Sequence, residues 1–186
     1  DHRDLHSFPT RRSSDLNPKV KGLNQFVNNV LYNWGNGGAY IMGDTQQKSD
    51  ADIRNNYFIV GTTDNYDGKK LGATAPFTRY NEHFSAYLSG IFCDDNKDGS
   101  LNGRELGRAD CMKKSVAAGE EIITSPTFLE RPSDVHPEIK ELMTAQEAYE
   151  WIVANGGSSL PVRDEVDAYL IDELTSLGKK GLIIHS

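Results

Sequence analysis

The sequence predicts a mainly β protein built as a solenoid of stacked coils. Residues 26–32 (Phe-Val-Asn-Asn-Val-Leu-Tyr) and 53–59 (Ile-Arg-Asn-Asn-Tyr-Phe-Ile) each carry an Asn-Asn pair, and the pairs lie 27 residues apart. A β segment that returns at such a spacing is typical of coils that each bury the neighbouring copy's apolar face. A weaker third copy at residues 87–92 has Ser89-Gly90 in place of the asparagines. The alternative is two unrelated strands that both end in Asn, which turns favour.

The asparagine pairs have a physical role in this interpretation. Amide side chains that stack coil upon coil can hydrogen-bond into a ladder along the solenoid. The repeat therefore predicts that Asn28 stacks on Asn55 and Asn29 on Asn56.

Length and charge limit the classes of protein. At 186 residues the chain is one domain or a piece of a larger one, and its net charge is −7. This negative net charge argues against nucleic acid as a partner, since phosphate binding needs clustered basic residues. No apolar run approaches the roughly 20 residues that cross a bilayer, so no membrane partner is expected. The negative charge also disfavours acidic polymers, unless a cation bridges the two.

Residues 1–16 do not read as part of a folded protein. They have no apolar periodicity and no hydrophobic region of a signal peptide. The run resembles the translation of a common sequencing adapter, which ends at Leu16. We therefore exclude this segment from fold reasoning and expect the natural chain to continue upstream of Asn17. An Arg/Ser-rich transit segment is the alternative.

The rest of the chain divides into two regions. Residues 17–124 contain short strands between polar loops, including a turn at 35–38, a strand at 39–42 and a surface loop at 64–70. Residues 125–186 begin with an extended segment, because three prolines between 125 and 137 exclude a long helix. The two helices that follow are expected to cover the flank of the strand stack.

Both helices have recognisable ends. The first starts at the capping box Thr144-Ala-Gln-Glu147, has its apolar side at Ala148, Trp151 and Ile152, and stops at Asn155-Gly156. The second starts near Ser159 and Pro161 and stops at Gly178. Its apolar face comprises Val166, Tyr169, Leu170, Leu174 and Leu177. Arg163, Asp164 and Asp167 are interpreted as a solvated face with acids near the helix start.

Residues 94–105 form the sharpest local motif, Asp-Asp-Asn-Lys-Asp-Gly-Ser-Leu-Asn-Gly-Arg-Glu. The pattern D-x-N-x-D-G-x-x-N-x-x-E supplies the oxygen ligands that calcium requires. The predicted ligands are Asp94, Asn96, Asp98, Ser100, Asn102 and Glu105. The lead-in reads as a strand, so the loop is not a regulatory EF-hand. An acidic Asx-turn loop without metal is the alternative.

Two cysteines bracket this loop. A disulfide between Cys93 and Cys111 would close it and stabilise the fold by about 3 kcal/mol in the chain-entropy model. Two free thiols are the alternative. The histidines His83, His136 and His185 show no metal or catalytic spacing and are interpreted as ordinary surface or loop residues. No phosphate-binding or dinucleotide-binding glycine motif is present.

The start of the region after residue 16 resembles a known family. Residues 17–22 (Asn-Pro-Lys-Val-Lys-Gly), followed by Phe-Val-Asn-Asn-Val-Leu-Tyr-Asn-Trp-Gly, look like the segment just past the active site of pectate lyases of polysaccharide lyase family 1. The tail from residue 159 to 184 looks like the end of the same proteins. The resemblance covers nearly all of residues 17–186, and it implies a right-handed parallel β-helix of which these are the C-terminal coils.

The family motif Arg-x-Pro-x-x-Arg/Lys maps onto individual positions. Pro18 matches its proline and Lys21 its second basic residue, which would meet a uronate carboxylate; Lys19 would add local positive charge. Plain surface charge is the alternative for both lysines. The first arginine of the motif, which acts as the base in this family, belongs at position 16, where this chain has Leu16. No catalytic residue is therefore assigned within the chain.

The resemblance implies part of a secreted, calcium-dependent pectate lyase that cleaves polygalacturonate or pectin by β-elimination. We expect the fragment itself to be inactive and the full-length protein to be a monomer. A non-catalytic, calcium-stabilised carbohydrate-binding or scaffold module, and a pectin lyase acting on methyl-esterified substrate, are the alternatives.

Overall fold

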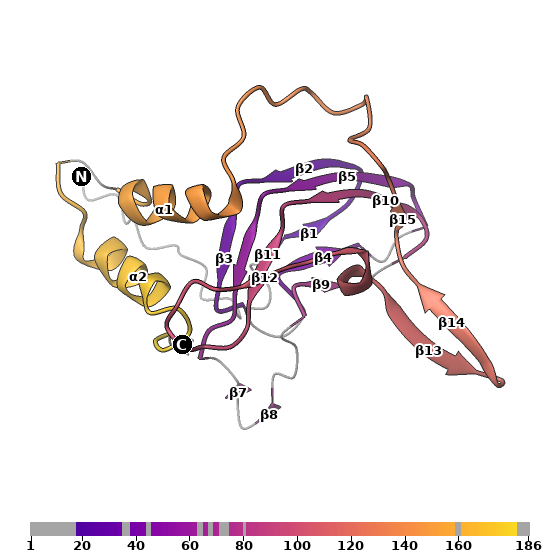
Figure 1. The fold of residues 1–186 in the computed structure, drawn as a ribbon, viewed down its shortest axis with the longest axis horizontal. Helices are drawn as coiled ribbons and strands as arrows, with labels where there is room; N and C mark the ends of the chain where they lie inside the picture. The colour runs from indigo at the N-terminus through magenta and orange to yellow at the C-terminus, as the bar shows by residue number, and fades with distance from the viewer. Residues whose placement is uncertain are drawn as a thin grey trace, which may run out of the picture.

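The computed structural model describes residues 18–34, 38–43, 46–62, 65–66, 69–70, 75–79, 81–158 and 161–181. The adapter-like residues 1–16, most of the turn predicted at 35–38 and the penultimate His185 lie outside these ranges. Most of the described chain is β structure, followed by two helices near its end (Figure 1).

Three successive coils each contribute one strand to each of three sheets, and their strands run parallel. Sheet A contains β1 (Lys19–Val20), β4 (Tyr40–Met42) and β9 (Phe77–Thr78). Sheet B contains β2 (Leu23–Val27), β5 (Ser49–Arg54), β10 (Phe84–Ser89) and β15 (Thr127–Phe128). Sheet C contains β3 (Val30–Tyr32), β6 (Tyr57–Ile59), β11 (Phe92–Asp94) and the antiparallel β12 (Arg104–Glu105).

The remaining strands lie outside the stack. β7 (Asn65–Tyr66) pairs with β8 (Lys69–Lys70), and β13 (Lys113–Ala117) pairs with β14 (Glu120–Thr124) in a hairpin that projects from the body (Figure 1). A short 3-10 helix, Arg108–Cys111, precedes this hairpin.

The repeat found in the sequence is a structural repeat. Phe26 pairs in register with Ile53, and Ile53 with Leu88, so the three copies are successive coils rather than unrelated strands. The alignment of the third copy was wrong by one residue. Arg54 pairs with Ser89, so Gly90 takes the place of Asn28 and Asn55.

The predicted amide ladder joins the first two coils. Asn29 donates from its backbone N–H and from Nδ2 to Oδ1 of Asn56, at 2.8 and 3.1 Å. Asn56 Nδ2 donates to the Phe26 carbonyl at 2.7 Å, and Asn28 Nδ2 donates to the Asn55 carbonyl at 3.3 Å. The ladder stops at the third coil, because Ile91 stands where Asn56 stood.

Backbone conformation explains which residues occupy this corner. Asn28, Asn55 and Gly90 have φ values of 56°, 53° and 61°, in the left-handed region that asparagine and glycine tolerate best. At Gly90 space also matters, since a Cβ there would lie 2.2 Å from Oδ1 of Asn55. The strand therefore turns from sheet B into sheet C at the same point in each coil.

The core lies inside the stack of coils. Aromatic rings from successive coils meet edge to face, with 5.5 Å between the centroids of Phe58 and Phe77 and 5.9 Å between those of Tyr40 and Phe77. Such contacts add to the apolar area that the rings bury. The other fully buried side chains of this core include Met42, Ile53, Phe84 and Ile91.

Two helices cover sheet C from outside (Figure 1). α1 (Ala145–Asn155) has the predicted capping box, in which Thr144 accepts from the Glu147 N–H, and buries Ala145, Ala148 and Tyr149. α2 (Glu165–Thr175) has its N-cap at Asp164, three residues after Pro161 and five after Ser159, where the start was predicted.

The apolar faces of the helices are only partly covered, which corrects the prediction. Leu174 and Leu177 are buried, but Val166, Tyr169 and Leu170 are exposed, and so is Trp151 on α1. The reason is that only the C-terminal end of α2 reaches the apolar cluster on sheet C. Among the described residues, no helix is long and apolar enough to cross a membrane. A mainly β chain with parallel sheets and two helices fits the expected parallel β-helix of a pectate lyase.

Candidate functional site

Lys19 is the first residue of β1, the first strand of sheet A, and Lys21, the second basic residue of the family motif, follows that strand directly. Val20 packs against the core, and the side chains on either side of it, Lys19 and Lys21, are exposed because strand side chains alternate between faces. The Lys21 side chain lies over Gly43 of the next coil, with Cγ 2.7 Å from the point where a Cβ of Gly43 would stand. Both lysine side chains are thus exposed at β1.

The calcium-type loop begins where β11 of sheet C ends. Asp94 is the last residue of that strand and is only 2% exposed, whereas Asn96 and Asp98 are exposed. Gly99 has a φ of 83°, which allows the sharp turn that the motif requires at this position. The loop then returns along sheet C as the antiparallel β12.

Hydrogen bonds join Asp94, Asn96, Asp98 and Asn102, which are all predicted ligands. Asn102 Nδ2 donates to Oδ2 of Asp98 at 2.9 Å, and Asn96 Nδ2 donates to Asn102 Oδ1 at 2.7 Å and to Asp98 Oδ2 at 3.2 Å. The Asn102 N–H donates to Oδ2 of Asp94 at 3.3 Å. The side chains of Asn96, Asp98 and Asn102 therefore converge inside the loop, and Asp94 joins them through the backbone of Asn102.

The two carboxylates have opposite electrostatic environments. Burial raises the pKa of Asp94, against hydrogen bonds from the backbone N–H groups of Asn102 and Asn96. Hydrogen bonds from the Asn102 side chain and from the Ser100 N–H lower the pKa of Asp98. Asp98 is thus held as a carboxylate by its donors, whereas at Asp94 the effect of burial outweighs that of its two donors.

The other two predicted ligands are placed differently. The Ser100 carbonyl accepts from the Asn102 N–H at 2.9 Å, and Glu105 lies exposed on β12 opposite Phe92. Within the described part of the chain, no three His, Cys, Asp or Glu side chains gather in a metal-binding group. The donor set of the loop is instead mixed, with two carboxylates, two amides and backbone oxygens, which is a composition that calcium accepts.

Loop and lysines belong to different parts of the molecule. Lys19 lies on sheet A and Lys21 directly follows its first strand, whereas residues 94–105 extend from sheet C and contact the end of α2. The loop and the two lysines therefore start from different sheets of the stack.

Both cysteines are free, buried thiols in the structure, which differs from the predicted disulfide. Burial raises the pKa of the Cys93 thiol to about 12, and the pKa of the Cys111 thiol is raised by burial as well. Each side chain is packed as an apolar residue of the core. The loop is closed by hydrogen bonds and packing instead.

Three residues interpreted as a solvated face have specific partners. Arg163 donates to the carbonyls that end α1, those of Val153, Ala154 and Gly156, at 3.0 to 3.1 Å. Asp164 is the N-cap of α2, and Asp167 accepts from the Ser158 N–H at 2.6 Å.

His136 is not an ordinary surface histidine. Its side chain is 4% exposed, and its Nε2 lies 2.7 Å from Oδ1 of Asp50 on β5. Nearby, Gln25 Nε2 donates to the Pro137 carbonyl at 2.9 Å. These contacts fasten the extended segment across sheet B.

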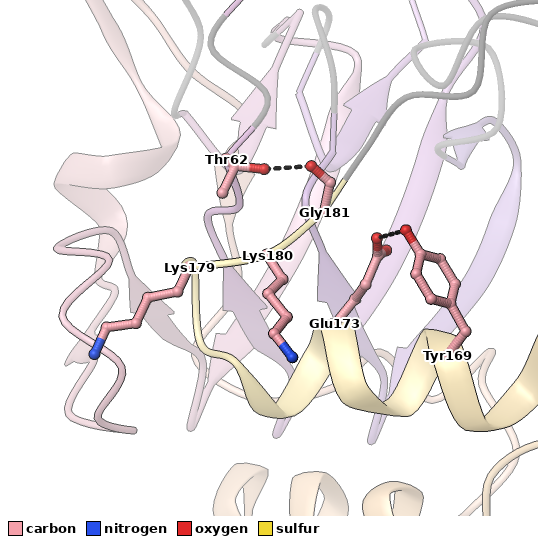
Figure 2. Close-up of a pocket in the computed structure, with 6 residues that line it drawn as sticks. All are labelled: Thr62, Tyr169, Glu173, Lys179, Lys180 and Gly181. Carbon is pink, nitrogen blue, oxygen red and sulfur yellow. Dashed lines mark hydrogen bonds between the residues drawn. The ribbon is translucent and has the colours of Figure 1, made fainter.

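A cavity of about 440 Å³ opens beside the end of α2 (Figure 2), and it is lined by Thr62, Tyr169, Glu173, Lys179, Lys180 and Gly181. Figure 2 shows two hydrogen bonds within it, from Tyr169 to Glu173 and from Thr62 to Gly181. Four of the six lining residues thus pair with one another, and Lys180 pairs with Asp172 outside the lining, so we assign no ligand to the cavity.

The described residues thus form a stack of parallel β coils from which loop 94–105 extends. The chain is similar to proteins named probable pectate lyase C: that of Emericella nidulans is 41% identical over 168 residues, covering 90% of this chain and 34% of the relative. Those of Neosartorya fischeri and Aspergillus flavus are 40% and 38% identical over the same length, covering 35% of each. The resemblance to pectate lyases predicted from the sequence is confirmed.

The chain spans about a third of the length of these relatives. No family model matches it. No solved structure matches it either.

Proposed function

We propose that the chain is the C-terminal part of a secreted, calcium-dependent pectate lyase, folded as coils of a right-handed parallel β-helix. The observation that carries the proposal is the exposed pair Lys19 and Lys21, which follows position 16, where the family has its arginine. The relatives of the chain, which are named probable pectate lyase C, support it. The substrate of the whole enzyme is polygalacturonate or pectin, and the enzyme acts as a monomer.

The reaction in this proposal is β-elimination. A base removes the C5 proton of a galacturonate unit, and the 4-O-glycosidic bond breaks. That proton becomes acidic enough only when positive charge stabilises the enolate-like intermediate next to the carboxylate. A calcium ion bound at the substrate cleft, distinct from the structural ion of loop 94–105, would supply part of this charge. Lys21 holds an ammonium on the outer side of β1 to meet the carboxylate, and Lys19 adds a second one.

The base is the residue that this chain lacks. The arginine of the family motif falls at position 16, where the sequence has Leu16. We therefore propose that the 186-residue chain has no lyase activity of its own.

Loop 94–105 binds calcium as a structural ion in this proposal, with Asp94, Asn96, Asp98, Asn102 and the carbonyl of Ser100 as ligands. Glu105 completes the shell after a rearrangement of its exposed side chain. Asn96 and Asn102 rotate their amides, so that oxygen atoms replace the N–H groups that now face Asp98.

Absorbance of unsaturated products from polygalacturonate with calcium tests the lyase. The 186-residue chain should give none, and a chain extended upstream with arginine directly before Asn17 should give turnover that Lys21→Ala reduces at least tenfold. Lys48→Ala is the control for loss of charge. Turnover by the unextended chain would contradict the assignment of the base, and an inactive extended chain that binds polygalacturonate would favour a binding module.

Calorimetry tests the loop. Titration of the chain with calcium chloride should give heat of binding that Asp98→Ala abolishes. Heat that Asp98→Ala and Glu105→Ala both leave undiminished would rule out the assigned ligands.

A further inference from the structure

The end of helix α2 packs directly against the calcium-type loop. Gly178, just after the helix, has a φ of 92°, and a Cβ at this position would lie 2.8 Å from Cα of Lys97 and 2.9 Å from the Val60 carbonyl oxygen. Neither neighbour is the end of a flexible side chain. Backbone therefore meets backbone here, and only glycine fits between helix and loop.

A second contact joins the loop to the helices through apolar side chains. Leu101, at the centre of the loop, packs against the cluster that also contains Leu174 and Leu177 from the end of α2 and Ala145 and Tyr149 from α1. A change in the loop backbone therefore alters the surface on which both helices lie.

A third contact is polar. Lys179 extends away from the Tyr169–Glu173 pair (Figure 2), and its Nζ lies over Gly99, 2.3 Å from the point where a Cβ of Gly99 would stand. The other side of the same segment is held by Tyr32, whose hydroxyl accepts from the Gly178 N–H at 3.3 Å and lies 3.1 Å from Oγ of Ser176. The segment after α2 is thus clamped between strand β3 and the loop.

We propose that a divalent cation in loop 94–105 fastens the helical layer, so that cation binding and the docking of α2 are thermodynamically coupled. This inference rests on the proposed calcium site. The docked helix end requires the ordered loop at Lys97, Gly99 and Leu101, and the cation requires the same ordered loop at its ligands. A ligand that binds only the docked state lowers the population of the undocked state by the factor 1 + [L]/Kd.

Hydrogen exchange of the 186-residue chain, with and without calcium chloride, measures this coupling. At a calcium concentration 100 times the Kd found by calorimetry, exchange of the α2 amides should slow by up to about 100-fold. The β13–β14 hairpin projects away from the loop, so its exchange rates should not change and serve as an internal control.

Two glycine variants separate the contact from backbone strain. Gly178→Ala should remove most of the calcium effect on α2 and weaken calcium binding. Gly119 also has a positive φ, of 83°, but nothing lies within 4 Å of a Cβ added there. Gly119→Ala should therefore keep both calcium binding and the effect of calcium on α2. If Gly178→Ala fails to fold, Leu101→Ala gives the same comparison through the apolar contact.

The two possible failures are distinct. Absence of calcium heat would remove the site and the coupling with it. Heat of binding with unchanged α2 exchange would leave the calcium site intact and overturn the coupling, as would equal effects of the two glycine variants.

Discussion

The amide ladder is the feature on which the stacking of the first two coils depends, and Asn56→Ala removes its centre. Asn56 is fully buried, and its amide makes three hydrogen bonds: it accepts from the N–H and from Nδ2 of Asn29, and it donates to the carbonyl of Phe26. Alanine keeps the backbone and removes all three.

The expected loss follows from what the substitution leaves behind. A typical hydrogen bond contributes about 1 kcal/mol net, and a buried polar group left without its partner costs about 1 to 3 kcal/mol. The N–H of Asn29 and the carbonyl of Phe26 both lose this partner. We expect the free energy of unfolding to fall by about 3 kcal/mol, which lowers Tm by about 6 to 12 °C for a chain of this size.

Urea unfolding followed by far-UV circular dichroism measures the loss. Asn155→Ala is the matched control, because it removes the amide of an exposed asparagine with one hydrogen bond, to the Trp151 carbonyl at 3.0 Å. The control should change stability by about 0.5 kcal/mol or less. A loss below about 1 kcal/mol for Asn56→Ala, or one equal to that of the control, would refute the structural role of the ladder.

Three further outcomes are expected. Arg163→Ala should cost about 1 to 2 kcal/mol in urea unfolding, because it removes three hydrogen bonds to the carbonyls that end α1, and an unchanged midpoint would contradict this. Gly90→Ala should cost more than Gly22→Ala, since both have positive φ but only at Gly90 would the new Cβ meet Oδ1 of Asn55, at 2.2 Å; equal losses would contradict the contact. The Cys93 thiol, with a pKa of about 12, should react with iodoacetamide about 1000-fold more slowly at pH 8 than a thiol with the ordinary pKa of 9.0, and its rate should rise about tenfold per pH unit up to pH 11. A chain that takes up no label after unfolding without reductant would carry the disulfide instead.

The stack of coils was predictable because a short sequence motif repeats from one coil to the next. The 27-residue spacing and the Asn-Asn pairs identify one strand corner, and the register of β2 on β5 confirms it. The third copy was placed one residue out because its signal is a single glycine. Gly90 replaces the asparagine with positive φ, and a test for left-handed conformation would have aligned it with Asn55 rather than with Asn56.

The exposure of the helices could not be predicted in the same way. Apolar periodicity gives the face of a helix that can be buried, but it does not give the length over which a partner covers that face. Leu174 reaches the cluster on sheet C and is buried, whereas Val166, two turns earlier on the same face, is 62% exposed.

The candidate loop was predictable in its centre and less so at its edge. Asp94, Asn96, Asp98 and Asn102 converge because their spacing alone brings them together in a tight turn.

The partners of Arg163 were not predictable, because they belong to another helix, and such contacts between elements leave no local pattern in the sequence.

A pair of charges buried on sheet B escaped the sequence analysis for the same reason. Asp52 and Arg54 are two residues apart on β5, so both side chains stand on the outer face of sheet B, where the extended segment covers them. Arg54 Nη2 donates to Oδ2 of Asp52 at 2.7 Å, and Gln25 Nε2 donates to the same oxygen at 3.1 Å. The Asp52 side chain is fully buried and that of Arg54 is 17% exposed.

Removal of one partner of the Asp52–Arg54 ion pair should lower stability strongly, whereas replacement of both partners by apolar residues should lower it little. Arg54→Met leaves the Asp52 carboxylate buried without its counter-charge and should cost about 3 to 5 kcal/mol. Both residues also have buried polar atoms without a partner in the described structure, Oδ1 of Asp52 and Nε of Arg54, so the pair does not recover its full desolvation penalty. The double variant Asp52→Leu with Arg54→Met should therefore regain most of the stability that the single variant loses. A double-mutant cycle in urea checks this, and a double variant no more stable than Arg54→Met alone would mean that the pair is a net source of stability.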